Sequence, residues 1–89
     1  MYSVSLSSYC SQLVELIGDT DVTTRAIACY DVGEFARVVP LGSKVLDKLE
    51  VKKKIMMQLG GDDPVVKEQA LVALQKIMAA SFKGGISVA

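Results

Sequence analysis

Two stretches of this 89-residue chain, LVELIGDTD at residues 13–21 and IMMQLGGDD at residues 55–63, decide its fold. Each reads as an apolar helical segment that ends at a glycine and leads through acidic residues into a longer apolar segment. The two stretches align when the sequence is compared with itself at a shift of 42 positions, and the match continues beyond them, since Ala28 aligns with Ala70. The chain therefore contains an internal repeat.

The residues between the paired segments predict how each helix ends and the next begins. Asp21 and Asp63 stand where a side-chain cap of the following helix is needed, and Pro64 suits the first helical turn. Gly18 and Gly60 are placed to close the preceding helices, for which we expect the left-handed backbone conformation.

Helical periodicity dominates the rest of the chain. Apolar residues recur three or four positions apart over 13–17, 51–59 and 65–80, and no segment alternates between apolar and polar residues over the length of a strand. A repeat period in the forties that is built from helices is typical of armadillo and HEAT solenoids. We therefore expect an all-α fold, an armadillo/HEAT-like α-α superhelix.

A short additional helix over residues 42–49 precedes the second copy, with Leu41, Val45 and Leu49 on one face. Three helices per unit favour armadillo over HEAT, and the first copy then lacks its opening helix. Because solenoids usually need about three repeats to be stable, a chain of about one and a half to two repeats is expected to be the terminal fragment of a longer solenoid. The expected organisation is a helical-repeat domain over 1–83, with an incomplete repeat at 7–39, a second repeat at 42–81 and a flexible tail at 84–89.

The composition excludes several classes of function. Ten basic and ten acidic residues cancel, so the chain has no overall field to attract nucleic acid. Histidine is absent, which removes histidine-based catalysis and the usual zinc sites, and no cofactor is expected. Cys10 and Cys29 are interpreted as small buried thiols in a reducing compartment, with a disulfide left open by the sequence. No apolar run is long enough to span a membrane, and the first residues do not resemble a signal peptide.

Asp31, Glu34 and Arg37 follow one another at three-residue spacing in the long helical segment of the first copy. Neighbours at this spacing can pair on a helix surface, so a Glu34–Arg37 ion pair is expected. The three side chains are interpreted either as a solvated polar stripe or as a docking stripe, because the third helices of armadillo units line the concave face of a solenoid. Catalysis by the two carboxylates is disfavoured, since no nucleophile, metal cluster or phosphate loop accompanies them.

Lys52, Lys53 and Lys54 form the one pronounced charge cluster. They are interpreted as a solvated shoulder between two helices or as a contact to an acidic partner, and no aromatic residue lies among them to indicate nucleic-acid binding. Gly33, in mid-helix, is explained either by close approach of a neighbouring helix, which we favour, or by tolerated drift. Three methionines are expected to fill the core and the repeat interface: Met56, Met57 and Met78.

The run from Ala28 to Arg37, followed by Pro40-Leu41-Gly42 and Lys44-Val45-Leu46, resembles the H subunit of the vacuolar-type proton-pumping ATPase, and more narrowly its C-terminal domain. A second run, from Val66 to Met78, is similar to the last helix of that family, and the resemblance extends over about residues 13–78. Ser43 and Lys67 depart from positions that are often basic and often arginine in the family, and the family's large N-terminal domain has no counterpart in this chain.

The resemblance implies a non-catalytic regulatory subunit of a helical-repeat type, not an enzyme. It would support ATP-driven proton pumping and help to silence ATP hydrolysis when the soluble catalytic sector detaches from the membrane. The implied partners are the soluble sector and the stalk subunits. The implied location is the cytoplasmic face of vacuolar and other internal membranes, with the chain attached through the complex and not inserted. Asp31, Glu34, Arg37 and the lysines at 52–54 are the candidate contacts.

A generic armadillo adaptor that holds an extended peptide is the alternative. The chain has no asparagine and no tryptophan, the residues that many such adaptors present along their groove. We also expect an apolar surface near Leu6, Leu13 and Leu16, which a preceding repeat would cover, and self-association through that surface.

Overall fold

The computed structural model describes the backbone of residues 6–85, and side chains within residues 8–81. This part of the chain is helical without any strand, which confirms the predicted all-α class and is compatible with an α-α superhelix. The armadillo assignment and the division into repeats stay predictions. The five helices are α1 (Leu6–Leu16), α2 (Val22–Val38), α3 (Gly42–Lys48), α4 (Val51–Leu59) and α5 (Pro64–Gly85). Helix α5 thus continues two residues into the expected tail, and 86–89 lie outside the described residues.

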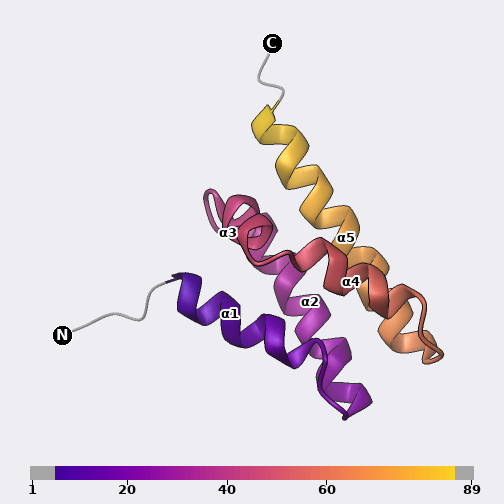
Figure 1. The fold of residues 1–89 in the computed structure, drawn as a ribbon. Helices are drawn as coiled ribbons and strands as arrows, with labels where there is room; N and C mark the ends of the chain where they lie inside the picture. Colours follow the sequence, from indigo (N-terminus) through magenta and orange to yellow (C-terminus); the bar gives the residue numbers. More distant parts are fainter. Residues whose placement is uncertain (1–5, 86–89) are drawn as a thin grey trace.

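The two long helices, α2 and α5, lie side by side and run in the same direction (Figure 1). In Figure 1, α1 packs across α2 and α4 packs across α5, so that each helix pair contributes one member to each of two layers. The molecule is a thin slab of 40 × 39 × 17 Å. The short helix α3 links the first pair to the second.

Gly33 sets the distance between α2 and α5. A Cβ atom at this position would lie 2.9 Å from the Cα of Ala73, closer than real Cβ atoms approach other atoms, and 3.2 Å from the Cβ of Ala73, which is tighter than most such contacts. The prediction that a neighbouring helix approaches closely at Gly33 is confirmed. Small residues on both helices therefore permit the close contact on which the layer of long helices depends.

The core follows the helical period that the sequence shows. On α2 the buried side chains recur three or four positions apart, and α4 contributes Val51 and Ile55 one turn apart. Cys10 and Cys29 are completely buried free thiols, as predicted, and burial raises the pKa of each to about 11. The largest fully buried side chains besides these are Ile17, Val32, Leu46, Val51, Ile55, Val66 and Ile77.

Both predicted aspartate caps are present. The carboxylate of Asp21 accepts a hydrogen bond from the backbone N–H of Thr24 at 2.9 Å, and that of Asp63 accepts from Val65 and Val66 at 2.9 and 3.1 Å. Pro64 is the first residue of α5, as expected. These bonds satisfy backbone donors that the first helical turn leaves without an intrahelical partner.

The prediction of left-handed glycines at the helix ends is wrong. Gly60 has a φ of −87°, and no glycine within the described backbone has a positive φ. Instead, the N–H of Gly18 donates to the carbonyl of Glu15 and that of Gly60 to Met57, each at 3.1 Å. These tighter three-residue turns satisfy the terminal carbonyls without a left-handed residue.

The left-handed positions lie at the two ends of α3, at Leu41 (φ 62°) and Glu50 (φ 55°). Leu41 is 70% exposed, so its predicted place on the inner face of this helix is wrong, whereas Val45 and Leu49 do pack against the core. Gly42 explains the turn, because a Cβ there would lie 2.8 Å from the carbonyl oxygen of Phe35 at the end of α2.

The prediction that three methionines fill the core is wrong as well, whereas their expected place at an interface between repeats stays a prediction. Met56, Met57 and Met78 are more than half exposed, because each follows or lies beside the buried position of its helix rather than on it. At the N-terminal end, Leu13 is buried and Leu16 is partly exposed, and the side chain of Leu6 lies outside the described residues. The expected uncovered surface is thus confirmed at Leu16 and wrong at Leu13, and self-association stays a prediction.

Candidate interaction surface

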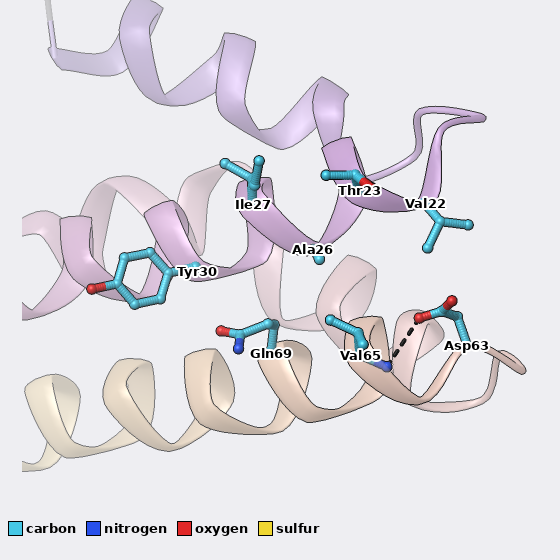
Figure 2. A pocket seen from close by; sticks show the side chains of 8 residues that line it. All are labelled: Val22, Thr23, Ala26, Ile27, Tyr30, Asp63, Val65 and Gln69. Atoms are coloured by element: carbon cyan, nitrogen blue, oxygen red, sulfur yellow. Dashed lines mark hydrogen bonds between the residues drawn. The ribbon is translucent and has the colours of Figure 1, made fainter.

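An open groove of about 540 Å³ lies between α2 and the N-terminal half of α5 (Figure 2). It is found on the N-terminal side of the Gly33–Ala73 contact, where both helices begin. The first turns of the two helices and the cap residue of α5 form its end. The groove is lined by Val22, Thr23, Ala26, Ile27, Tyr30, Asp63, Val65 and Gln69.

The groove exposes large apolar side chains from both helices. Ile27 and Val65 are each 55% exposed, and Tyr30 and Val22 are also open to solvent. Single exposed apolar residues are common on protein surfaces, whereas a contiguous group around a groove makes that groove a candidate interaction site. The carboxylate of Asp63 is already engaged in capping α5, so the groove offers mainly apolar contact.

A charged cluster follows the groove toward the C-terminal end of α2. The carboxylate of Glu34 accepts from Arg37 Nη2 at 2.8 Å and from Lys76 Nζ of α5 at 2.5 Å. The ammonium of Lys76 also lies 4.6 Å from the centre of the Tyr30 ring, within range of a cation–π contact. The cluster therefore joins α2 to α5 and connects directly to the aromatic edge of the groove.

The electrostatics of the cluster keep Glu34 ionised. The hydrogen bonds from Arg37 and then from Lys76 lower the pKa of the Glu34 carboxyl to about 2, and the same contact raises the pKa of Arg37. Lys76 is well covered, with 23% of its side chain exposed, whereas Arg37 is 61% exposed. The guanidinium of Arg37 is thus the most exposed charge of this cluster.

The structure brings together only some of the predicted site residues. Glu34 and Arg37 form the expected ion pair, while Asp31 is half-buried on α2 outside the cluster. Lys52, Lys53 and Lys54 are exposed on α4, which neither lines the groove nor takes part in the cluster.

Sequence reasoning missed Lys76 and the apolar groove residues. A signal for Lys76 exists in the sequence, because Glu34 and Lys76 are separated by 42 positions, the shift that superposes the two copies. Parallel neighbouring helices place equivalent positions of successive repeats close together. The repeat register therefore predicts this ion pair once parallel stacking is assumed.

The described residues contain no group of three histidine, cysteine, aspartate or glutamate side chains close enough to hold a metal ion. Likewise, within the helices described, none combines the length and the apolar character that crossing a membrane requires. The groove between α2 and α5 exposes apolar side chains beside the Glu34–Arg37 ion pair. Apolar contacts combined with a few charged groups are typical of protein–protein interfaces.

Comparison with known proteins gives a consistent result. The family model described as the V-ATPase H subunit matches residues 5–82. The V-type proton ATPase H subunit of Drosophila melanogaster is 40% identical over 63 residues, which are 71% of this chain and 14% of the fly protein. The second of the probable V-type proton ATPase H subunits of Caenorhabditis elegans is 32% identical over 72 residues, 80% of this chain and 15% of the relative.

A probable V-type proton ATPase H subunit of Oryza sativa subsp. japonica is 32% identical over 57 residues, 64% of this chain and 13% of the plant protein. The chain thus spans only about a seventh of the length of the curated relatives it matches. No solved structure matches it. Because the family model covers most of its length, the chain belongs to the family of V-ATPase H subunits, within their C-terminal domain.

Proposed function

We propose that this chain acts as a non-catalytic regulatory and scaffolding part of a vacuolar-type proton-pumping ATPase. It supports ATP-driven proton transport and silences ATP hydrolysis in the detached soluble sector, through contacts with the soluble sector and the stalk subunits. The complex holds it at the cytoplasmic face of vacuolar and other internal membranes. The observation that carries this proposal is the family match over residues 5–82, together with relatives that are named as H subunits of V-type proton ATPases.

The proposed mechanism is mechanical. The close Gly33–Ala73 contact and the Glu34–Lys76 ion pair fix α2 and α5 relative to each other, which supports a stiff element that can hold two other subunits together or apart. The cysteine thiols are unsuited to nucleophilic chemistry, because burial raises their pKa to about 11 and leaves very little thiolate at neutral pH.

We assign the main contact to the groove between α2 and α5, with Arg37 as the charge at its far end. Asp31 and the lysines at 52–54 remain candidate contacts on other parts of the surface. Glu34 is proposed to act chiefly by orienting Arg37 and holding Lys76, since both of its carboxylate oxygens are engaged inside the chain.

The test is binding to the soluble sector of a vacuolar-type ATPase from which the H subunit has been removed, with ATP hydrolysis followed in parallel. Ile27→Ser removes an exposed apolar side chain from the groove, and Leu71→Ser is the matched control, because Leu71 is 47% exposed on α5 and does not line the groove. A minority of interface residues, the hot spots, each account for more than about fivefold in affinity. We expect Ile27 to be one of them, so that Ile27→Ser loses at least about fivefold, and we expect little change for Leu71→Ser.

The outcomes separate the parts of the proposal. Binding together with reduced hydrolysis supports regulation by these 89 residues. Binding without any change in hydrolysis makes the chain an anchor and rejects the silencing role. If the full-length H subunit binds and this chain does not, the contact lies elsewhere in the full-length protein.

A generic armadillo adaptor is the second candidate, and the apolar groove of about 540 Å³ favours it. A peptide array distinguishes the two functions. One strong linear motif whose binding is lost in Ile27→Ser, without any binding to the soluble sector, would move the adaptor function to first place.

A further inference from the structure

The two helix pairs, α1 with α2 and α4 with α5, lie side by side, so each pair has an outer side that faces away from the other (Figure 1). They carry the two copies of the sequence repeat, which are related by a shift of 42 positions. The exposure of a residue in one copy can therefore be compared with that of its equivalent in the other. A position that is buried in one copy and exposed in the other marks a side that a neighbouring pair covers.

The outer side of the second pair exposes positions that the first pair buries. Cys29 and Ala36 lie on the side of α2 that faces α5, one turn before and after Gly33, and they are 0% and 4% exposed. Val14 of α1 is 7% exposed and lines a hollow between α1 and α4. The equivalents of Val14, Cys29 and Ala36 are 57%, 47% and 55% exposed, in this order: Met56, Leu71 and Met78. The second pair thus leaves uncovered the side that the first pair packs against its neighbour.

The outer side of the first pair shows the reverse difference. Leu16 lies on the side of α1 opposite Val14 and is 40% exposed. Val38 lies on the side of α2 opposite Cys29 and is 59% exposed. The equivalents of Leu16 and Val38 in the second pair are half-buried: Gln58 and Ala80. The first pair thus leaves open the side with which the second pair covers it.

We propose that a second copy of this chain stacks on the first head to tail, with the outer side of its α1–α2 pair against the outer side of the α4–α5 pair. Within one chain, the side that bears Cys29 and Ala36 is covered by another copy of the same repeat. The equivalent side at Met56, Leu71 and Met78 therefore suits a helix pair of the same kind, and a second chain supplies one whose covering side is open. A head-to-tail contact leaves one open side at each end, so association continues beyond the dimer.

The charges along the same register are compatible with this contact. Lys76 pairs with Glu34 of its own chain, and the two occupy equivalent positions of the repeat. Continued stacking places Glu34 of the second copy beside Lys76, so that opposite charges alternate along the assembly. Gln75, however, stands where Gly33 permits the close α2–α5 contact, and its longer side chain keeps the second helix further away. We therefore expect weak association, with a Kd in the micromolar to millimolar range.

The test is sedimentation velocity of the full 89-residue chain over micromolar to millimolar concentrations. We expect the weight-average sedimentation coefficient to rise steadily with concentration and not to level off at the value of a dimer, because the open sides accept further copies. Amide chemical shifts recorded over the same concentrations should change on the outer sides of both helix pairs.

Two charge substitutions each block one side. Met78→Glu places a carboxylate on the outer side of α5, and Val38→Glu places one on the outer side of α2. Each variant alone is expected to lose at least about fivefold in association. In a mixture, the intact α1–α2 side of Met78→Glu meets the intact α4–α5 side of Val38→Glu. The mixture should therefore form dimers with the affinity of the unmodified chain and nothing larger.

Met57→Glu is the matched control, since Met57 is 69% exposed and lines the hollow between α1 and α4 rather than an outer side. It is expected to associate like the unmodified chain. Thermal unfolding followed by circular dichroism checks that each variant is folded, which all three should be because the substituted side chains are exposed.

Three results would overturn the proposal. The first is a chain that stays monomeric at millimolar concentration. The second is a mixture of Met78→Glu and Val38→Glu that stays monomeric, since the contact would then not join the two outer sides. The third is an equal loss of association in Met57→Glu and Met78→Glu, which would place the contact elsewhere. The measurement contains no ATPase, so failure here is separable from failure of the proposed function.

Discussion

Replacing Gly33 by alanine is the sharpest test of the packing between α2 and α5. Alanine favours the helix over glycine by about 1 kcal/mol, so on propensity alone the variant should be more stable. The added Cβ, however, would meet the Cα of Ala73 at 2.9 Å and the Cδ of Lys76 at 3.1 Å. The first of these is a backbone atom, so relief requires α5 to move away from α2.

Overpacking of this kind costs about 1–3 kcal/mol. Because the added Cβ would meet a backbone atom, which cannot rotate away as a side chain can, we expect a cost of about 2–3 kcal/mol, from which the gain in propensity of about 1 kcal/mol is subtracted. We therefore expect Gly33→Ala to lower the free energy of unfolding by about 1–2 kcal/mol, or the Tm by about 4–8 °C for each kcal/mol in a domain of this size. The measurement is thermal and urea unfolding followed by circular dichroism at 222 nm.

Gly60→Ala is the matched control. Gly60 has an ordinary φ of −87°, and the nearest atom to an added Cβ there is 3.6 Å away, so the change in stability should stay within about 0.5 kcal/mol. An unchanged or higher Tm for Gly33→Ala, with Gly60→Ala behaving as expected, would refute the close-packing argument.

Three further predictions concern the charges, a helix cap and the thiols. The partners of Glu34 lower its pKa from 4.5 to about 2, so its ionised carboxylate stabilises the fold fully above about pH 4.5, and this stabilisation is lost as the pH falls toward 2. Urea unfolding should therefore find Glu34→Gln less stable than the unmodified chain at pH 7. At pH 2 the two should be equally stable. Asp63→Ala should lower the free energy of unfolding by about 0.5–2 kcal/mol, because the cap of α5 is lost, whereas Asp62→Ala should leave it nearly unchanged. If thermal unfolding showed an equal effect of the two changes, the cap would not be the cause. Cys10 and Cys29 should react with Ellman's reagent only after addition of denaturant, since both are completely buried, and rapid reaction of the native chain would contradict their burial.

The sequence allowed much of this fold to be predicted because the repeat constrains the positions of the helices relative to one another. The two aspartate caps and the close approach at Gly33 each follow from a local physical requirement, and each is present. The Glu34–Arg37 pair was predictable from spacing along one helix. Predicting the Glu34–Lys76 pair requires the register between α2 and α5. The shift of 42 positions gives this register only if the two helices are assumed to stack in parallel.

The failures have physical reasons too. Helical periodicity gives the direction of the buried face but not its width. The core is thin, so Met56 and Met57 lie outside it although they directly follow the buried Ile55. The left-handed backbone was expected at glycines and occurs instead at Leu41 and Glu50. At Leu41 the cause is tertiary, since the next residue must approach the carbonyl of Phe35, which no local pattern reveals.

The conformation of Leu41 and Glu50 has a consequence for motion within the chain. A left-handed conformation costs a residue with a side chain about 1–2 kcal/mol, and here two such residues bracket a helix of only seven residues. Local opening of α3 releases both, and the contact between α2 and α5 still holds the two halves together, so backbone amides of α3 should exchange with deuterium before those of α2. The connection between the two helix pairs can thus open locally without separating them, because the direct contact between α2 and α5 does not pass through α3.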